Sequence, residues 1–141
     1  MKADISFIGF GEASTAFATS GGWCGEAVAY DRKVDDPALA NVKREECLRA
    51  GVACADTVAQ AIAAPLILSL VTADQALEAA RSASKALAPG ILYCDGNSVA
   101  PQTKQAAAAL IEAAGGHYVD MAIMSPVYPA QLDAPLSLSG P

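Results

Sequence analysis

Short apolar runs alternate with longer segments of helical periodicity along most of the chain. The apolar runs predict strands at residues 5–8, 27–30, 52–54, 66–71, 91–94 and 118–123. The segments between them predict helices at residues 12–20, 37–50, 57–63, 73–87 and 101–114. Because this alternation is typical of βαβ units, it predicts an α/β domain with a mostly parallel sheet.

Local residue chemistry agrees with these helix boundaries. Thr57 and Thr72 each precede a predicted helix and have a glutamine three residues later, as in a capping box. Gly51 and Gly115 stand where helices should end, and glycine readily takes the left-handed conformation that closes a helix. We therefore expect a Rossmann-type, doubly wound sheet with strand order 3-2-1-4-5-6 and the apolar segment 136–138 added near its edge.

Length and charge limit the classes of function. At 141 residues the chain is about one ordinary domain long. A net charge of -6 with nine basic residues argues against binding to a nucleic-acid backbone. The longest apolar stretch, residues 57–73, is broken by Gln60 and Pro65 and is shorter than the roughly 20 residues of a membrane helix. No export signal is apparent, so we expect a cytoplasmic protein with neither nucleic acid nor membrane as a partner.

The cysteines and the single histidine do not suggest a metal site. Cys24, Cys47, Cys54 and Cys94 are scattered without a C-x-x-C pair, and we expect them to act as small buried hydrophobic residues. His117 precedes an apolar run and is either a general acid or base or a residue at the start of a strand. The second interpretation is favoured because no partner carboxylate or nucleophile is indicated nearby.

The segment GFGEAS follows the first predicted strand and opens the first predicted helix, as a dinucleotide-binding fingerprint does. Gly9 permits a tight turn, Gly11 lets the backbone approach a pyrophosphate, and the helix start supplies N–H donors. Ser14 departs from the glycine or alanine that usually ends the fingerprint, at a position where a small side chain allows close packing. A plain surface turn is the alternative. We expect cofactor contacts from Gly9, Phe10, Gly11, Glu12 and Ala13.

Asp31 ends the second predicted strand, about 20 residues after the glycine turn, where an acidic residue accepts hydrogen bonds from the adenosine ribose. An ordinary turn carboxylate is the alternative. Arg32 and Lys33 follow directly, and a guanidinium can hold the 2′-phosphate that a carboxylate repels. We expect Asp31 and Arg32 to contact the cofactor, with NAD favoured and NADP left open.

Several motifs together resemble the NAD(P)-binding domain of the β-hydroxyacid dehydrogenase and 6-phosphogluconate dehydrogenase superfamily, in particular its bacterial oxidoreductases. The first is Gly9-Phe-Gly-Glu-Ala13, and the second is Leu70-Val-Thr-Ala-Asp-Gln-Ala76, which resembles the family's loop after the fourth strand. Asp95-Gly-Asn-Ser-Val-Ala-Pro101 resembles its Asp-x-[Ser/Asn]-[Ser/Thr]-x-x-Pro motif, and Gly115-Gly-His-Tyr-Val-Asp120 looks like the approach to its next strand. The resemblance covers nearly the whole chain.

The resemblance implies further site residues. Val71, Thr72 and Ala73 would flank the adenosine and its ribose, Asn97 would lie near the nicotinamide ribose or carboxamide, and Ser98 would stand on the substrate side. These positions agree with the rule that ligands bind at the carboxyl ends of parallel strands. A turn and helix cap before Pro101 is the alternative role of Asn97 and Ser98, and the two roles are compatible.

Two departures from the family pattern matter. The substrate-binding turn of the family is typically Pro-Val-Ser-Gly-Gly, whereas residues 122–126 read Ala-Ile-Met-Ser-Pro, so substrate identity does not carry over. We expect Met121 and Met124 to be core side chains. In the family, a helical domain follows the point that Gly140-Pro141 resembles and supplies the catalytic lysine, and no such domain is expected here. Lys104 is expected to face solvent and not to replace that lysine.

Residues 1–141 are thus interpreted as one NAD(P)-binding domain. The resemblance implies that the intact protein is an NAD(P)-dependent dehydrogenase, a homodimer, that transfers a hydride between nicotinamide and a hydroxyl-bearing carbon of a small acid. This chain alone is expected to be inactive, and its catalytic residue is not assigned. Two alternatives stay open: a non-catalytic dinucleotide-binding or interaction module, and a relative that reduces imines.

Overall fold

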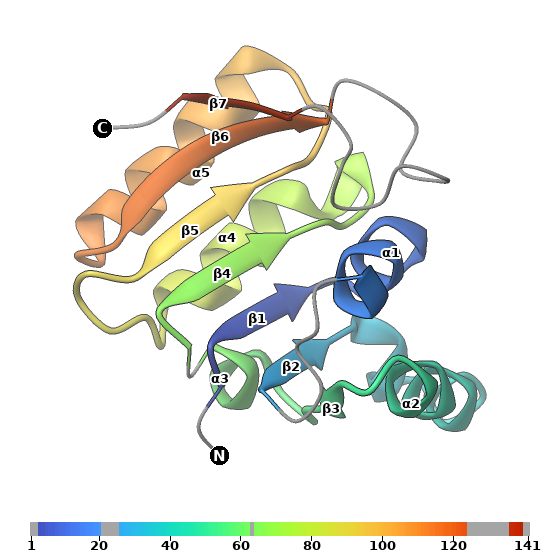
Figure 1. Cartoon of the computed structure of the whole chain (residues 1–141). Helices are drawn as coiled ribbons and strands as arrows, with labels where there is room; N and C mark the ends of the chain where they lie inside the picture. The colour runs from blue at the N-terminus through green and yellow to red at the C-terminus, as the bar shows by residue number, and fades with distance from the viewer. Residues whose placement is uncertain (1–2, 21–25, 63, 124–135, 140–141) are drawn as a thin grey trace.

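The computed structural model describes residues 3–20, 26–62, 64–123 and 136–139, which form one sheet with helices on both faces (Figure 1). The strands are β1 (Ile5–Ile8), β2 (Ala27–Tyr30), β3 (Ala53–Cys54), β4 (Leu66–Ser69), β5 (Leu92–Asp95), β6 (His117–Ile123) and β7 (Leu136–Ser139). Their order is β3-β2-β1-β4-β5-β6-β7. The first six strands are parallel, and β7 runs antiparallel to β6 at the edge. The predicted Rossmann-type fold, its strand order and its edge segment are confirmed.

The helices lie where the prediction placed them, but several begin later or end earlier than predicted. They are α1 (Glu12–Ser20), α2 (Ala40–Arg49), α3 (Val58–Ala61), α4 (Ala76–Ser84) and α5 (Pro101–Ala113). Two 3-10 helices, η1 (Arg32–Asp35) and η2 (Ala73–Gln75), occupy residues outside the α-helices. The hydroxyl of Thr57 accepts a hydrogen bond from the N–H of Gln60, as a cap should. Thr72 makes no side-chain cap bond, so the second predicted capping box is wrong.

Alternating strand residues pack against helices on opposite faces of the sheet. Phe7 and Leu68 belong to a core cluster with Phe17 of α1 and Cys47 of α2. Ile67, the neighbour of Leu68, belongs to the cluster that includes residues of α4 and α5. Figure 1 shows α4 and α5 together behind the central strands. This two-sided burial explains the continuous apolar character of the central strands.

The parallel register brings the carboxyl ends of the strands to one edge of the sheet. Ile8 pairs with Tyr30 on one side and with Ser69 on the other, and Ser69 pairs in turn with Asp95. Asp95 pairs with Asp120. Strands β2 and β3 are added on one side of β1, and β4, β5 and β6 are added on the other side. The switch point is therefore between β1 and β4, and doubly wound folds bind ligands at such a point. Among the described residues, no helix combines the length and apolar character that crossing a membrane requires.

Candidate functional site

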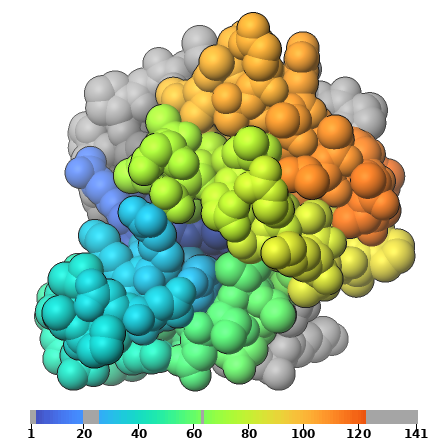
Figure 2. All heavy atoms as spheres, turned by 180° about the vertical axis from the view of Figure 1, so that it is seen from behind, coloured from blue at the N-terminus to red at the C-terminus, as the bar shows by residue number. Residues whose placement is uncertain are grey.

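A cleft of about 550 Å³ opens at this carboxyl edge. Figure 2 shows the hollow from behind, with blue atoms of the N-terminal segment between cyan and yellow-green segments. Its lining includes all the predicted cofactor and substrate residues other than Phe10 and Ala73. Phe10 is fully buried beneath the turn, and Ala73 is exposed at the start of η2. The fold therefore brings together segments that lie far apart in the sequence.

Gly9 and Gly11 have different roles in the turn between β1 and α1. Gly9 has a φ of 86°, and a Cβ there would lie 2.2 Å from the carbonyl oxygen of Leu70. Only glycine fits this position. A Cβ on Gly11 would meet nothing within 4 Å, and Gly11 lines the cleft, so the space next to its Cα is open. The first glycine is thus required by the fold, and the second leaves room for a ligand.

Ser14 strengthens the turn instead of loosening it. Its side chain is fully buried, and its hydroxyl donates a 2.7 Å hydrogen bond to the carbonyl of Gly9. The N–H of Gly9 donates to the carbonyl of Tyr30 at 2.8 Å. The departure from the usual fingerprint therefore replaces a packing glycine with a small residue that joins α1 to the turn.

The carboxylate of Asp31 joins the end of β2 to the glycine turn. One oxygen accepts a hydrogen bond from the N–H of Lys33 and caps η1, and the other accepts from the N–H of Phe10, both at 2.9 Å. Asp31 also lines the cleft, and its side chain is 13% exposed. Asp31 therefore acts as a turn carboxylate, as one interpretation expected. Its predicted contact with a ribose stays a prediction, and its position in the lining of the cleft is compatible with that contact.

Lys43 is a site residue that the sequence interpretation missed. It lies on α2, lines the cleft and has a side chain only 5% exposed. Its Nζ donates to the carbonyl of Phe10 at 2.7 Å, pairs with Glu46 at 2.6 Å and lies 3.9 Å from Asp31. A lysine in a helix is usually solvated, so the sequence carried no signal for this position.

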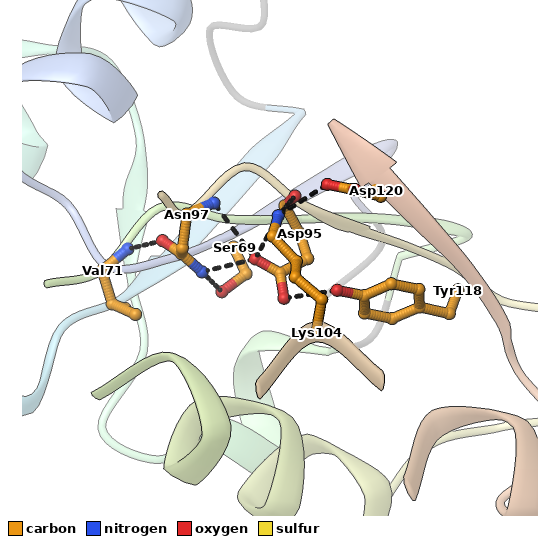
Figure 3. Close-up of polar contacts among 7 residues, drawn as sticks. All are labelled: Ser69, Val71, Asp95, Asn97, Lys104, Tyr118 and Asp120. Atoms are coloured by element: carbon orange, nitrogen blue, oxygen red, sulfur yellow. Dashed lines mark hydrogen bonds and ion pairs between the residues drawn. The ribbon is translucent and has the colours of Figure 1, made fainter. Parts of the chain in front are cut away.

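Asn97 connects the loops that follow β4 and β5 (Figure 3). Its Oδ1 accepts from the N–H of Val71 at 2.7 Å. Its Nδ2 donates to Oγ of Ser69 at 3.2 Å and to Oδ1 of Asp95 at 2.8 Å. Both amide hydrogens are thus engaged within the protein, so Asn97 fixes the wall of the cleft. Ser98 follows it, exposed and in the lining.

Lys104 does not face solvent, so that prediction is wrong. Its side chain is 13% exposed, and its Nζ donates to the carbonyl of Asp95 at 2.8 Å and to Oδ1 of Asp120 at 2.7 Å. The reason is that Lys104, in the first turn of α5, lies beside Asp95 at the end of β5 and Asp120 within β6 (Figure 3). Tyr118 donates to Oδ2 of Asp95 at 2.7 Å. Burial and this carboxylate raise the pKa of the Tyr118 phenol.

The histidine, cysteines and methionine that the structure describes lie outside the lining of the cleft. His117 is exposed at the start of β6, as expected of a residue that begins a strand. Cys47 is buried, Cys54 and Cys94 are half-buried, and all three are free thiols. Within residues 3–20, 26–62, 64–123 and 136–139, no cluster of His, Cys, Asp or Glu is suited to a metal ion. Met121 lies in the core as predicted, whereas Cys24 and Met124 are outside the described residues.

Comparison with known proteins agrees with this geometry. The family model described as the NAD binding domain of 6-phosphogluconate dehydrogenase matches residues 4–137. No curated protein matches the sequence.

Solved structures extend the comparison. A conserved hypothetical protein from Sinorhizobium meliloti 1021 is 36% identical, with a TM-score of 0.89 over 98% of this chain and 47% of that protein. The protein MTH1747, of unknown function and described as similar to 3-hydroxyacid dehydrogenases, is 30% identical, with a TM-score of 0.77 over 96% of this chain and 49% of its own. An imine reductase from Aspergillus terreus in complex with NADPH4 is 22% identical and shares the fold, with a TM-score of 0.71 over 89% of this chain and 43% of its own. The chain spans about half the length of these proteins.

Proposed function

Because the chain belongs to the family of the NAD binding domain of 6-phosphogluconate dehydrogenase, we propose that its cleft binds NAD(H) or NADP(H) for an oxidoreductase. The observation that carries this proposal is the open space before Gly11 at the N-terminus of α1. Within the described part of the chain, no residue accepts a hydrogen bond from the N–H groups of Gly11, Glu12 or Ala13. These donors, together with the helix dipole, suit a pyrophosphate.

The remaining contacts follow from the lining of the cleft. Asp31 would accept hydrogen bonds from the adenosine ribose, while Val71 and Thr72 would flank the adenosine. Arg32 and Lys33 are exposed beside Asp31 and offer positive charge to a 2′-phosphate. We favour NAD because the Asp31 carboxylate is fixed by two backbone N–H groups and repels such a phosphate.

The bound dinucleotide would supply the hydride donor or acceptor. Ser98, exposed at the end of the cleft wall held by Asn97, would orient the substrate. We propose a small hydroxyacid as the substrate, supported by the likeness of MTH1747 to 3-hydroxyacid dehydrogenases. Reduction of an imine is the second candidate, supported by the shared fold of the A. terreus enzyme. We assign the proton-transferring group to a segment that these longer proteins have and this chain does not span, so the chain alone binds without turnover.

Titration of the chain with NADH and NADPH, followed by nicotinamide fluorescence, tests the cofactor proposal. Binding of at least one is expected, and failure of both to bind rejects it. Asp31→Asn tests the preference, because asparagine keeps an acceptor for a backbone N–H while removing the charge. The NADPH-to-NADH dissociation-constant ratio should fall about tenfold; an unchanged ratio rejects this role of Asp31. Turnover of hydroxyacids or cyclic imines by the chain alone would show that the proton-transferring group lies within it.

A further inference from the structure

Lys43, on α2, is a buried cation that contacts the glycine turn through a backbone carbonyl. Its Nζ donates to the carbonyl oxygen of Phe10, 33 residues earlier in the chain, at 2.7 Å. The same Phe10 donates its N–H to Asp31. The peptide groups on both sides of Phe10 are therefore fixed by side chains from outside the turn, one at the end of β2 and one on α2.

The orientation of the Phe10 carbonyl also determines the direction of the next N–H. In a planar trans peptide, the carbonyl of Phe10 and the N–H of Gly11 point in opposite directions. Holding the carbonyl toward Lys43 therefore holds the N–H of Gly11 away from it. Gly9 is equally constrained, because its N–H donates to Tyr30 and its carbonyl accepts from Ser14. The turn is thus fixed at Gly9 and Phe10, while the donors of the following residues stay available.

We propose that Lys43 is a positioning residue that orients the Phe10–Gly11 peptide so that the turn is pre-formed to receive a diphosphate. This inference rests on the proposed dinucleotide binding. Pre-forming the turn increases affinity, because the backbone is already ordered before the ligand arrives. Lys43 acts through Phe10 and is not required to touch the ligand.

Direct attraction between the Lys43 charge and a phosphate is the competing explanation. The contacts of Lys43 argue against it, since Nζ is paired with Glu46 at 2.6 Å and lies 3.9 Å from Asp31. Two carboxylates beside one ammonium leave no net positive charge at this corner of the cleft. Positioning therefore accounts better than charge for a buried lysine at this place.

The first test compares ADP with adenosine as probes, using isothermal titration of the full chain. Lys43→Met keeps the length and the apolar stem but removes the donor. It should weaken ADP binding by about tenfold or more and change adenosine binding by less than about twofold. Arg44→Met is the matched control, since Arg44 is a cation on the same helix that pairs with Asp56 and lies outside the lining of the cleft. It should leave both affinities unchanged.

A second variant separates positioning from charge and remains informative if Lys43→Met does not fold. Glu46→Gln removes an anion from a side chain that is 41% exposed, so the fold should tolerate it. If Lys43 attracted phosphate directly, this change would strengthen ADP binding. Positioning predicts equal or weaker binding, because Lys43 loses the partner that holds it toward Phe10.

The outcomes separate the two proposals. Suppose that the unaltered chain binds ADP and either NADH or NADPH. If Lys43→Met then weakens the affinities for ADP and adenosine equally, or changes neither affinity, the role of Lys43 is rejected while dinucleotide binding stands. Stronger ADP binding by Glu46→Gln also rejects it. If the unaltered chain binds none of these nucleotides, the proposed function and the role of Lys43 fail together.

Discussion

The Oδ1 atom of Asn97 accepts a 2.7 Å hydrogen bond from the N–H of Val71, 26 residues earlier in the chain. This bond joins the loop after β5 to the loop after β4, and both loops line the cleft. The amide group of Asn97 is itself held by Ser69 and Asp95. One wall of the cleft therefore depends on a side chain that has little contact with solvent.

Removing the Asn97 amide should destabilise the domain. Asn97→Ala leaves the N–H of Val71 without its acceptor and should lower the free energy of unfolding by about 2 kcal/mol. Asn97→Asp should cost more, because its second oxygen would face Oδ1 of Asp95, now 2.8 Å from Nδ2. Urea unfolding at neutral pH measures both. An aspartate variant as stable as the alanine variant would contradict the contact described between Asn97 and Asp95.

Lys104 should contribute to stability through the two carboxylates it joins. Asp95 is 1% exposed, so Lys104→Met would leave this buried carboxylate with its Tyr118 and Asn97 hydrogen bonds but without a cation. We expect a loss of about 2 kcal/mol in the free energy of unfolding. Lys85→Met is the control, because Lys85 is exposed at the end of α4 and its loss should change stability by less than about 0.5 kcal/mol. Equal effects of the two changes in urea unfolding would rule out the bridging role.

The fold was largely predictable because its signals are local. Alternating periods give the strands and helices, and the order of a doubly wound sheet follows from βαβ connections. The helix predicted at 73–87 is instead the 3-10 helix η2 (Ala73–Gln75) followed by α4 (Ala76–Ser84), and neither Thr72 nor Gln75 makes a side-chain cap hydrogen bond. Differences of this size at helix ends do not alter the core.

The polar contacts of the site were less predictable because they join distant positions. Lys43 and Lys104 both look like ordinary solvated lysines in helices, and only the packing of α2 and α5 brings them to Phe10 and Asp95. The glycine motif and Asp31 could be identified because their spacing reflects one βαβ unit. No comparable sequence spacing marks a lysine that becomes buried through tertiary packing.

Substitution of Gly9 should reduce the stability of the domain, whereas substitution of Gly11 should reduce nucleotide binding. Gly9→Ala places a Cβ against the carbonyl of Leu70 at a positive φ and should cost about 3 kcal/mol of stability. The Cβ of Gly11→Leu meets no neighbour within 4 Å, so we expect the melting temperature to change little while the side chain blocks nucleotide binding. Thermal unfolding and NADH titration of both variants provide the comparison. Retained binding in a folded Gly11→Leu variant would place the phosphates elsewhere.

Cys47 should make the stability of the domain depend on alkaline pH. Burial, together with the thiol of Cys54, raises the pKa of Cys47 from 9.0 to about 12. The unfolded chain therefore loses this proton near pH 9 while the folded chain keeps it. The contribution is fully present below pH 9.0 and falls as pH rises toward about 12. The stability advantage of the unaltered chain over Cys47→Ala should shrink by about 1.4 kcal/mol between about pH 8 and 10, measured by urea unfolding. An advantage that does not change with pH would show that Cys47 titrates normally in the folded domain.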